Sequence, residues 1–175
     1  MNAKQTAWVR FTWDLARLDL HLSAPGGYRF SSAVAADEDE VLQVVLSAYA
    51  SDPTWRPMMD GIAQRLTERI LTTFGERDAD YLITKDGERI VGVSGVAKSH
   101  WTDQHLLTGV CILPAHQRRG IGTHLLGLSL RRLREMGVES ARVYTKARSL
   151  AERKIYPKFG SVREEGVIYP ATTQN

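Results

Sequence analysis

The six residues from Gln117 to Gly122 have the composition of an anion-binding turn. They read Gln-Arg-Arg-Gly-Ile-Gly and follow Leu106 to Leu113, an apolar, β-branched segment that predicts a buried strand. Pro114 has no N–H to donate and ends the strand, and an amphipathic helix is predicted to begin at about Gly120. The first N–H groups of a helix lack partners and its dipole is positive there, so the turn favours phosphate groups.

Three further features of this turn bear on the kind of phosphate ligand. Gly120 and Gly122 have no Cβ, so a phosphate has room to approach the backbone. The Walker A pattern GxxxxGK[ST] does not occur, and the dinucleotide pattern GxGxxG fails at Leu125, where its third glycine would stand. What remains is Q-x-x-G-x-G directly after a strand.

This pattern resembles the acetyl-coenzyme A signature of the GNAT superfamily, the GCN5-related N-acetyltransferases. The resemblance extends over roughly Tyr28 to Ile168 and is sharpest from Val110 to Thr123. It implies an α/β fold with a mixed sheet, mostly antiparallel, in which one parallel strand pair is splayed by a bulge and about four helices flank the sheet. Gly109 is consistent with a bulge there, although a plain strand glycine explains it equally well.

The resemblance also implies acetyl-CoA as co-substrate and names the residues that bind it. The backbone N–H of Val110 is in the place that binds the thioester oxygen, and the N–H and C=O of Ile112 are in the place that pairs with pantetheine. The full set of implied coenzyme-binding residues is Val110, Ile112, Gln117, Arg118, Arg119, Gly120, Ile121, Gly122, Thr123 and Ser149. Arg153 and Lys154 are within reach of the 3′-phosphate, although exposed helix charges are the simpler interpretation.

A second signature of the family, N-x-x-A-x-x-x-Y-x-x-x-G-F, is matched in part near the C-terminus. Tyr156 and Gly160 stand at the expected positions, whereas Ser149, Glu152 and Ser161 replace the usual Asn, Ala and Phe. By this resemblance Tyr156 is the general acid that protonates the departing thiolate, and a Tyr with pKa about 10 holds its proton at neutral pH. A core tyrosine on an amphipathic helix is the alternative interpretation.

The general base is less clearly indicated. Family members often carry Glu four residues before the oxyanion amide, but Leu106 occupies that position here. Asp103, His105 and His100 lie nearby in the sequence, and histidine has the most useful pKa near neutral pH. Each of the three is equally well explained as a solvated loop residue.

Other candidate groups indicate no additional chemistry. The histidines lack metal-ligand spacing, so no metal is expected. Cys111 is interpreted as a packed strand residue, and direct attack in a ternary complex is preferred to a covalent route. The basic cluster Arg131-Arg132-Leu133-Arg134 is interpreted as a solvated helix face. On the acceptor side, Trp55, Met58 and Met59 either line the pocket, as the resemblance implies, or cover the core.

The elements that must position these residues follow from periodicity and turn signals. Strands are predicted at Tyr28 to Val34, Tyr81 to Thr84, Ile90 to Ala97, Leu106 to Leu113, Ser140 to Thr145 and Ser161 to Tyr169. Helices are predicted from Asp37 to Ala50, with Asp37 as cap and Glu40 as its acidic partner, then from Asp60 to Phe74, from Gly120 to Met136 and from Ser149 to Lys158. The strands at Leu106 and Ser140 are joined through a helix and should be parallel.

The 175 residues suit one domain, residues 28–170, preceded by an N-terminal extension, residues 1–27, that reads as an edge strand, a hairpin or a contact with a second copy in a homodimer. The net charge of +3 is too mild to indicate nucleic-acid binding. Cys111 is the only cysteine, which favours a reducing, cytoplasmic setting, and no apolar run long enough for a membrane span occurs.

The sequence therefore predicts an N-acetyltransferase that moves an acetyl group from acetyl-CoA to a primary amine of a small molecule or peptide. Because Leu106 replaces the usual acid, an acyl-CoA-binding module without turnover, serving as sensor or partner, stays open as the alternative. Nucleic-acid binding through the arginine-rich helix is a third and weaker interpretation.

Overall fold

The computed structural model describes residues 7–99 and 102–169. His100, one of the three predicted base candidates, lies outside the described residues. The elements are β1 (Trp8–Asp14), β2 (Arg29–Ser32), α1 (Glu38–Ser51), α2 (Met59–Thr73), β3 (Ala79–Asp86), β4 (Arg89–Ala97), β5 (Leu106–Ile112), α3 (Ile121–Glu135), β6 (Ser140–Lys146), α4 (Leu150–Lys154) and β7 (Val162–Val167). Within these residues, no helix is both long enough and apolar enough to cross a membrane.

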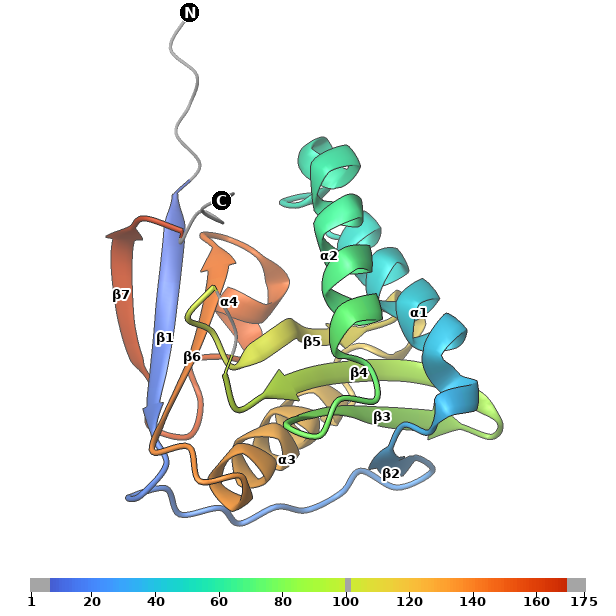
Figure 1. Ribbon diagram of the computed structural model, residues 1–175, viewed down its shortest axis with the longest axis horizontal. Helices are drawn as coiled ribbons and strands as arrows, with labels where there is room; N and C mark the ends of the chain where they lie inside the picture. The colour runs from blue at the N-terminus through green and yellow to red at the C-terminus, as the bar shows by residue number, and fades with distance from the viewer. Residues whose placement is uncertain (1–6, 100–101, 170–175) are drawn as a thin grey trace, which may run out of the picture.

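The strands form two sheets, with the orders β2-β3-β4-β5 and β6-β1-β7 (Figure 1). Each ladder between neighbouring strands of the described residues is antiparallel. The prediction of an edge element for the N-terminal segment is wrong, because β1 is the middle strand of its sheet. Its side chains Phe11 and Trp13 are fully buried between that sheet and α3. How far the family domain extends toward the N-terminus stays a prediction.

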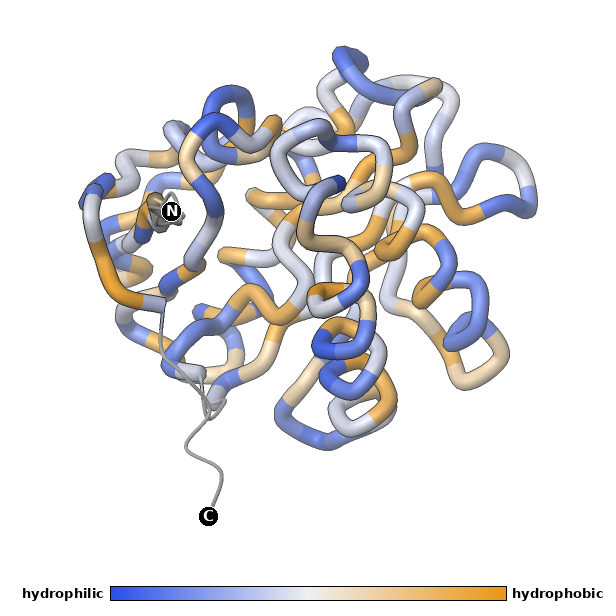
Figure 2. Tube along the Cα trace, turned by 90° about the horizontal axis from the view of Figure 1, so that it is seen from above, coloured by the Kyte–Doolittle hydropathy of each residue, from blue (hydrophilic) through white to orange (hydrophobic). Residues whose placement is uncertain are grey.

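Three long helices cover the four-stranded sheet. α1 and α2 pack on one face, and α3 packs on the other face, in the angle between the two sheets (Figure 1). Apolar segments gather in the interior and polar segments lie outside (Figure 2). On α2 the apolar pattern predicts that Ile62, Leu66, Ile70 and Leu71 point inward. The first three are buried, but Leu71 is 56% exposed, because it lies about 100° around the helix from Ile70.

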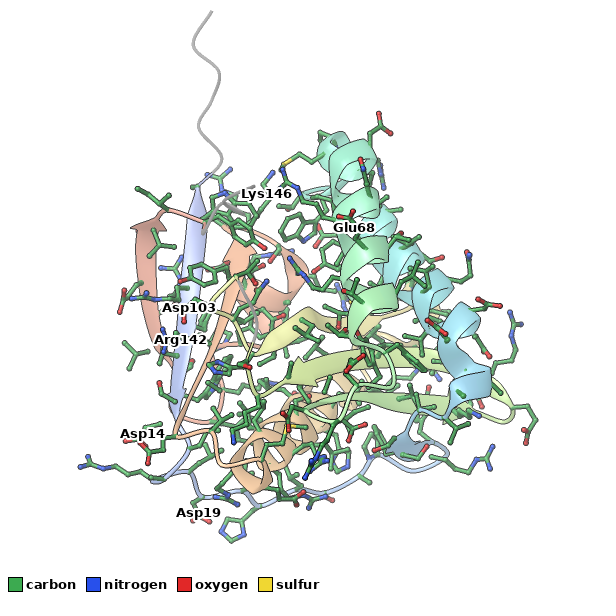
Figure 3. The ribbon with its side chains drawn as sticks, in the orientation of Figure 1. Asp14, Asp19, Glu68, Asp103, Arg142 and Lys146 are labelled. Atoms are coloured by element: carbon green, nitrogen blue, oxygen red, sulfur yellow. The ribbon has the colours of Figure 1, made fainter. Side chains whose placement is uncertain are left out.

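The strands β5 and β6 begin side by side and then separate. The N–H of His105 donates to the C=O of Arg142 at 2.9 Å, and Nδ1 of His105 accepts from the N–H of Arg142 at 3.1 Å. Asp103 adds an ion pair to Arg142 at 2.8 Å (Figure 3). Beyond this junction no ladder joins β5 to β6 in the part of the chain that the structure describes. The expected parallel pair is therefore a wedge, closed at His105 and open toward Ile112 and Lys146.

A bulge in β5 lies between the closed end and the open end of this wedge. Between the pairs Ser94–Val110 and Val96–Leu106, the single residue Gly95 of β4 faces three residues of β5. Gly109 has φ +65°, a conformation that other residues rarely adopt, so the bulge interpretation of this glycine is the correct one. The side chain of Thr108 accepts from the N–H of Gly95 at 2.9 Å and replaces the missing ladder bond.

The helix ends follow the sequence with two exceptions. Gly120 is the N-cap of α3 with φ +82°, and Gly137 follows its C-terminus with φ +89°. The capping box predicted for α1 does not form: Asp37 accepts from the N–H of Val34, and Glu40 accepts from the N–H of Ile90. The helix predicted up to Lys158 ends at Lys154, three residues before Pro157, so Tyr156 lies in the irregular segment that follows α4.

Candidate active site

The open wedge contains a cavity that runs along the edge of β5 that has no ladder partner in the described residues. Its walls come from the C-terminal end of α1, the C-terminal halves of β5 and β6, and the segment that includes α4. The lining residues with polar groups or backbone facing the wedge include Tyr49, Asp52, Val110, Ile112, Gln117, Tyr144, Thr145 and Tyr156. Residues predicted from two separate motifs, 110–117 and 149–160, therefore share one cavity.

The two predicted catalytic groups, the Val110 amide and the Tyr156 hydroxyl, form a hydrogen bond with each other. The backbone N–H of Val110 donates to Oη of Tyr156 at 3.1 Å, and both residues are buried. The Cβ that another residue would carry in place of Gly109 would lie 2.5 Å from the same hydroxyl. Glycine at this position is therefore required twice, once by its φ angle and once by the approach of Tyr156.

The environment of Tyr156 keeps its hydroxyl protonated. Phe11 and Trp13 contact the ring, with centroids 5.6 and 6.0 Å away. Burial raises the pKa of Tyr156 above its ordinary value of 10.0, and the hydrogen bond from Val110 only partly opposes this shift. A neutral phenol that accepts one hydrogen bond still has its own proton to donate, as a general acid must.

The predicted phosphate turn lines a second hollow that shares Ile112, Gln117 and Ile155 with the first. Its lining includes Gly120, Gly122 and Thr123, together with the cationic side chains of Arg118, Arg153, Lys154 and Lys158, and it contains no Asp or Glu. Arg118 has φ +62° and Gly120 has φ +82°, so both residues of this turn have the left-handed backbone conformation. The two hollows form one continuous trough of mainly positive charge.

The structure adds a second reason for Gly122. The Cβ of any other residue would lie 2.8 Å from Cδ1 of Ile155, so the missing side chain makes room for the segment after α4. The close approach of a phosphate to this glycine stays a prediction. Gly120 meets only Pro25, at 4.0 Å, and its positive φ is what requires glycine.

Three predicted coenzyme-binding residues have other contacts. The side chain of Gln117 donates to the C=O of Ile112 at 3.2 Å and holds the turn against β5. Ser149 is buried, accepts from the N–H of Glu152 at 3.2 Å as the α4 cap, and is outside the lining of the trough. Arg119 donates to Oη of Tyr28 at 3.1 Å and also lies outside the lining.

A third hollow lies on the far side of the Gly109 bulge. Five aromatic side chains line it and contact one another in the order Tyr144, Tyr169, Trp8, Trp55 and Tyr49, with ring centroids 4.5 to 5.8 Å apart. Tyr49, Trp55 and Tyr144 also line the wedge cavity, so they form the wall between the two hollows. Tyr49 donates to the C=O of Thr108 at 2.7 Å and stabilises the bulge.

The comparison with protein families decides between the interpretations of this trough. Residues 43–160 match the model of the family described as Acetyltransferase (GNAT) family. The match covers well over half of the chain. The chain belongs to the GNAT acetyltransferase family.

Similar proteins and structures agree with this assignment. The mycothiol acetyltransferase of Corynebacterium glutamicum (strain R) is 29% identical over 121 residues, which is 66% of this chain and 39% of that protein. That of Segniliparus rotundus is 26% identical over 145 residues, 76% of this chain and 51% of that protein. The chain thus spans about half the length, or less, of these relatives.

Two solved GNAT structures show the same fold. The GCN5-related N-acetyltransferase from Sphaerobacter thermophilus has a TM-score of 0.58 at 17% identity, covering 91% of this chain and 49% of that one. The GCN5-related N-acetyltransferase from Kribbella flavida has a TM-score of 0.57 at 16% identity, covering 92% of this chain and 56% of that one.

Two of the predicted base candidates, Asp103 and His105, are described by the structure, and both lie away from the wedge cavity. Asp103 and His105 sit at the closed end of the wedge, bonded to Arg142, and neither lines the cavity or the aromatic hollow. Burial and the nearby Arg142 lower the pKa of His105. Leu106 is 1% exposed and lines the aromatic hollow. The one carboxylate in these linings, Asp52, already accepts from the N–H groups of Thr54 and Leu150 at 2.9 Å.

Cys111 behaves as the sequence suggested. Its thiol is buried and donates to the C=O of Thr108 at 3.4 Å. Burial raises its pKa well above the ordinary value, so it carries its proton at neutral pH and is a poor nucleophile.

Sequence reasoning missed much of the aromatic hollow. Trp55 lines both the wedge cavity and the aromatic hollow and also covers the core, so both predicted roles apply to it. Met58 and Met59 line neither of these two cavities. No motif in the sequence singles out Trp8, Tyr49, Tyr144 or Tyr169. Only their contacts in three dimensions reveal the set.

Proposed function

We propose that this chain transfers an acetyl group from acetyl-CoA to a primary amine by direct attack within a ternary complex. The observation that carries the proposal is the Val110–Tyr156 pair, which lies where the cationic trough meets the aromatic hollow. The thioester of acetyl-CoA supplies the activated acetyl group. The residues of the trough supply mainly positive charge for the coenzyme, and the one carboxylate in its lining, Asp52, is engaged by two backbone N–H groups.

In this proposal Val110 and Tyr156 exchange partners when the coenzyme binds. The N–H of Val110 turns from the phenol to the thioester oxygen and stabilises the negative charge that develops there. The released hydroxyl of Tyr156 donates its proton to the departing sulfur. The N–H of Ile112 lies two residues along the strand and points to the same side as that of Val110, where it is available to the pantetheine arm.

The amine loses its proton without a dedicated base in this proposal. Asp52 is engaged by two backbone donors, and the aromatic hollow is lined by Arg65 and Arg69 with no Asp or Glu. Nearby positive charge disfavours the protonated form of an amine and lowers its pKa. The neutral nucleophile is therefore favoured by the electrostatics of the hollow, and the proton leaves to solvent.

Calorimetric titration with acetyl-CoA tests the donor half. Gly120→Asp introduces a carboxylate at the helix N-terminus and strains a position with φ +82°, so we expect the Kd to rise about 100-fold or more. Gly137→Asp is the matched control, because it strains φ +89° at the other end of the same helix with nothing within 4 Å. Equal affinity in both variants, or no heat with the wild-type protein, would refute the proposal.

Free-thiol release with a panel of amines then separates turnover from binding. The alternative, a coenzyme-binding module without turnover, is favoured by Leu106 at the place of the usual acid. Binding of acetyl-CoA with no amine-dependent thiol release would support that module instead.

A further inference from the structure

The aromatic hollow contains two guanidinium groups with no counter-ion. Arg65 and Arg69 lie four residues apart on α2 and therefore on one face of the helix, and both line the hollow. No carboxylate of residues 7–99 and 102–169 lies within 4 Å of either group, although the same chain pairs arginines with acids elsewhere, at Asp80, Asp103 and Glu152. These two charges are therefore placed at the hollow without neutralisation.

Arg69 is only partly satisfied by the protein. It donates to the C=O of Leu107 at 2.7 Å and to Oη of Tyr169 at 3.0 Å. Its Nε is buried and has no hydrogen-bond partner in the described residues. A guanidinium has five N–H groups, and a buried donor or charge without a partner costs free energy, so this group is suited to receive an acceptor from a ligand.

The rest of the lining disfavours a polycationic ligand. The hollow has no Asp or Glu in its lining, whereas recognition of a polycationic amine needs opposite charge. Lys146 lies at the open end of β6 (Figure 3) with Nζ 5.8 Å from the ring centroid of Trp55, which adds a third positive charge at the margin. The aromatic walls favour an apolar body, and the two arginines favour an anion.

We infer that the acceptor of this chain is a small amine that carries an anionic group, a carboxylate or a phosphate, bound by Arg65 and Arg69. The inference rests on the proposed acetyl transfer and adds the chemical class of its acceptor. Arg69 also holds the carbonyl of Leu107, so this cationic group is joined to the bulge that precedes the Val110 amide. An amino-acid-like acceptor with an apolar or aromatic substituent would place its anion at the arginines and its apolar body against the aromatic walls.

Matched acceptors test the inference through thiol release from acetyl-CoA. Phenylalanine carries the carboxylate that phenylalaninamide and phenylalaninol lack, so we expect phenylalanine to have the lowest KM although its amine is the more basic one. Arg69→Gln should raise that KM about 10- to 100-fold and leave the KM for acetyl-CoA unchanged, because a hydrogen bond between charged groups is lost. Arg65 is exposed at the rim, and Arg65→Gln should cost about 2- to 5-fold.

Two further variants separate charge from packing. Arg69→Lys keeps the charge and should retain part of the preference for phenylalanine, whereas a purely structural role of Arg69 at the bulge predicts that Lys and Gln behave alike. Arg89→Gln, an exposed arginine at the β3–β4 turn, is the control and should change nothing. Equal use of all three acceptors by the wild-type protein would overturn the inference.

A binding measurement keeps this inference distinct from the proposed function. Phenylacetate and phenylacetamide are titrated while tryptophan fluorescence is recorded, since Trp8 and Trp55 line the hollow. We expect phenylacetate to bind more tightly than the amide, and Arg69→Gln to remove the difference. Absence of thiol release with every amine would count against acetyl transfer alone. Absence of phenylacetate binding, or its persistence in Arg69→Gln, would count against the anion site alone.

Discussion

The cationic trough and the aromatic hollow meet at Gly109 but are constructed in different ways. The glycine turn and the Val110 amide of the trough come from backbone within residues 109–158, one strand–turn–helix–strand–helix sequence, although the end of α1 adds a side-chain wall. The hollow uses side chains from β1, α1, α2, β6 and the segment after β7. A binding site made from backbone has a local sequence signature, whereas a site made from distant side chains has none.

The largest effect is expected where the two regions share a wall. Gly109→Val places a Cβ 2.5 Å from Oη of Tyr156 at a position with φ +65°, so it strains the bulge and displaces the phenol. We expect the free energy of unfolding to fall by about 2–4 kcal/mol, with loss of both coenzyme binding and turnover. Urea denaturation and calorimetry measure these quantities. Gly26→Ala is the control, because nothing lies within 4 Å of its Cβ. Retained turnover in the valine variant would show that the wall is dispensable.

A smaller effect should be confined to the donor side. Tyr156→Phe removes the proposed acid, so we expect kcat to fall about 100-fold while the Kd for acetyl-CoA stays within a few-fold, as the coenzyme takes over the Val110 amide. Single-turnover rates and calorimetry separate the two effects. Tyr81→Phe, which removes a buried hydroxyl bonded to Thr73 far from the trough, should leave kcat unchanged. A similar fall in both variants would indicate a packing defect instead of lost acid catalysis.

The smallest effect concerns the junction between His105 and Arg142, which joins β5 to β6 at the closed end of the wedge. The pKa of His105 is lowered in the folded chain, chiefly by burial and next by Arg142, with Asp103 opposing. A depressed histidine pKa means that its stabilisation is complete above the ordinary value of 6.5 and is lost as the pH falls below it. We expect His105→Gln to flatten this pH dependence by at most about 1 kcal/mol, since solvent screens the partly exposed ring.

Denaturation midpoints between pH 5 and 8 measure this dependence, in a range where only histidine has an ordinary pKa. His21→Gln is the control, because its side chain is 88% exposed and paired only with Asp19. Because His105 lies outside both cavity linings, its replacement should leave the pH profile of kcat/KM unchanged. A changed activity profile would restore His105 as a base.

Much of the fold could be predicted because its signals are local. The strand at Leu106, the Gly120 turn, the α3 helix with Gly137 after it, and the strand at Ser140 follow one another without interruption. The partial second signature placed Tyr156 in the same cavity as Val110, since a capped helix and a glycine with positive φ fix the chain there.

The remainder could not be predicted because it depends on which strands become neighbours. The alternate residues Val9, Phe11 and Trp13 form the buried face of β1, but an edge strand and a central strand of an antiparallel sheet can share that pattern. The capping box at Asp37 failed because Glu40 found a long-range partner in Ile90. Asp103 and His105 are near β5 in sequence, yet the direction of β5 carries them to the closed end of the wedge, where they contact Arg142.

The position of β1 has a consequence for how the molecule forms. Among the described residues its ladder partners are β6 and β7, which follow it by more than 120 residues, with Trp8 opposite Lys146 and Val167. Such distant pairing carries a high loop-closure entropy and slows folding. During synthesis this first strand emerges long before its partners, so the smaller sheet, and the aromatic hollow that depends on it, is completed only when the last strand has left the ribosome.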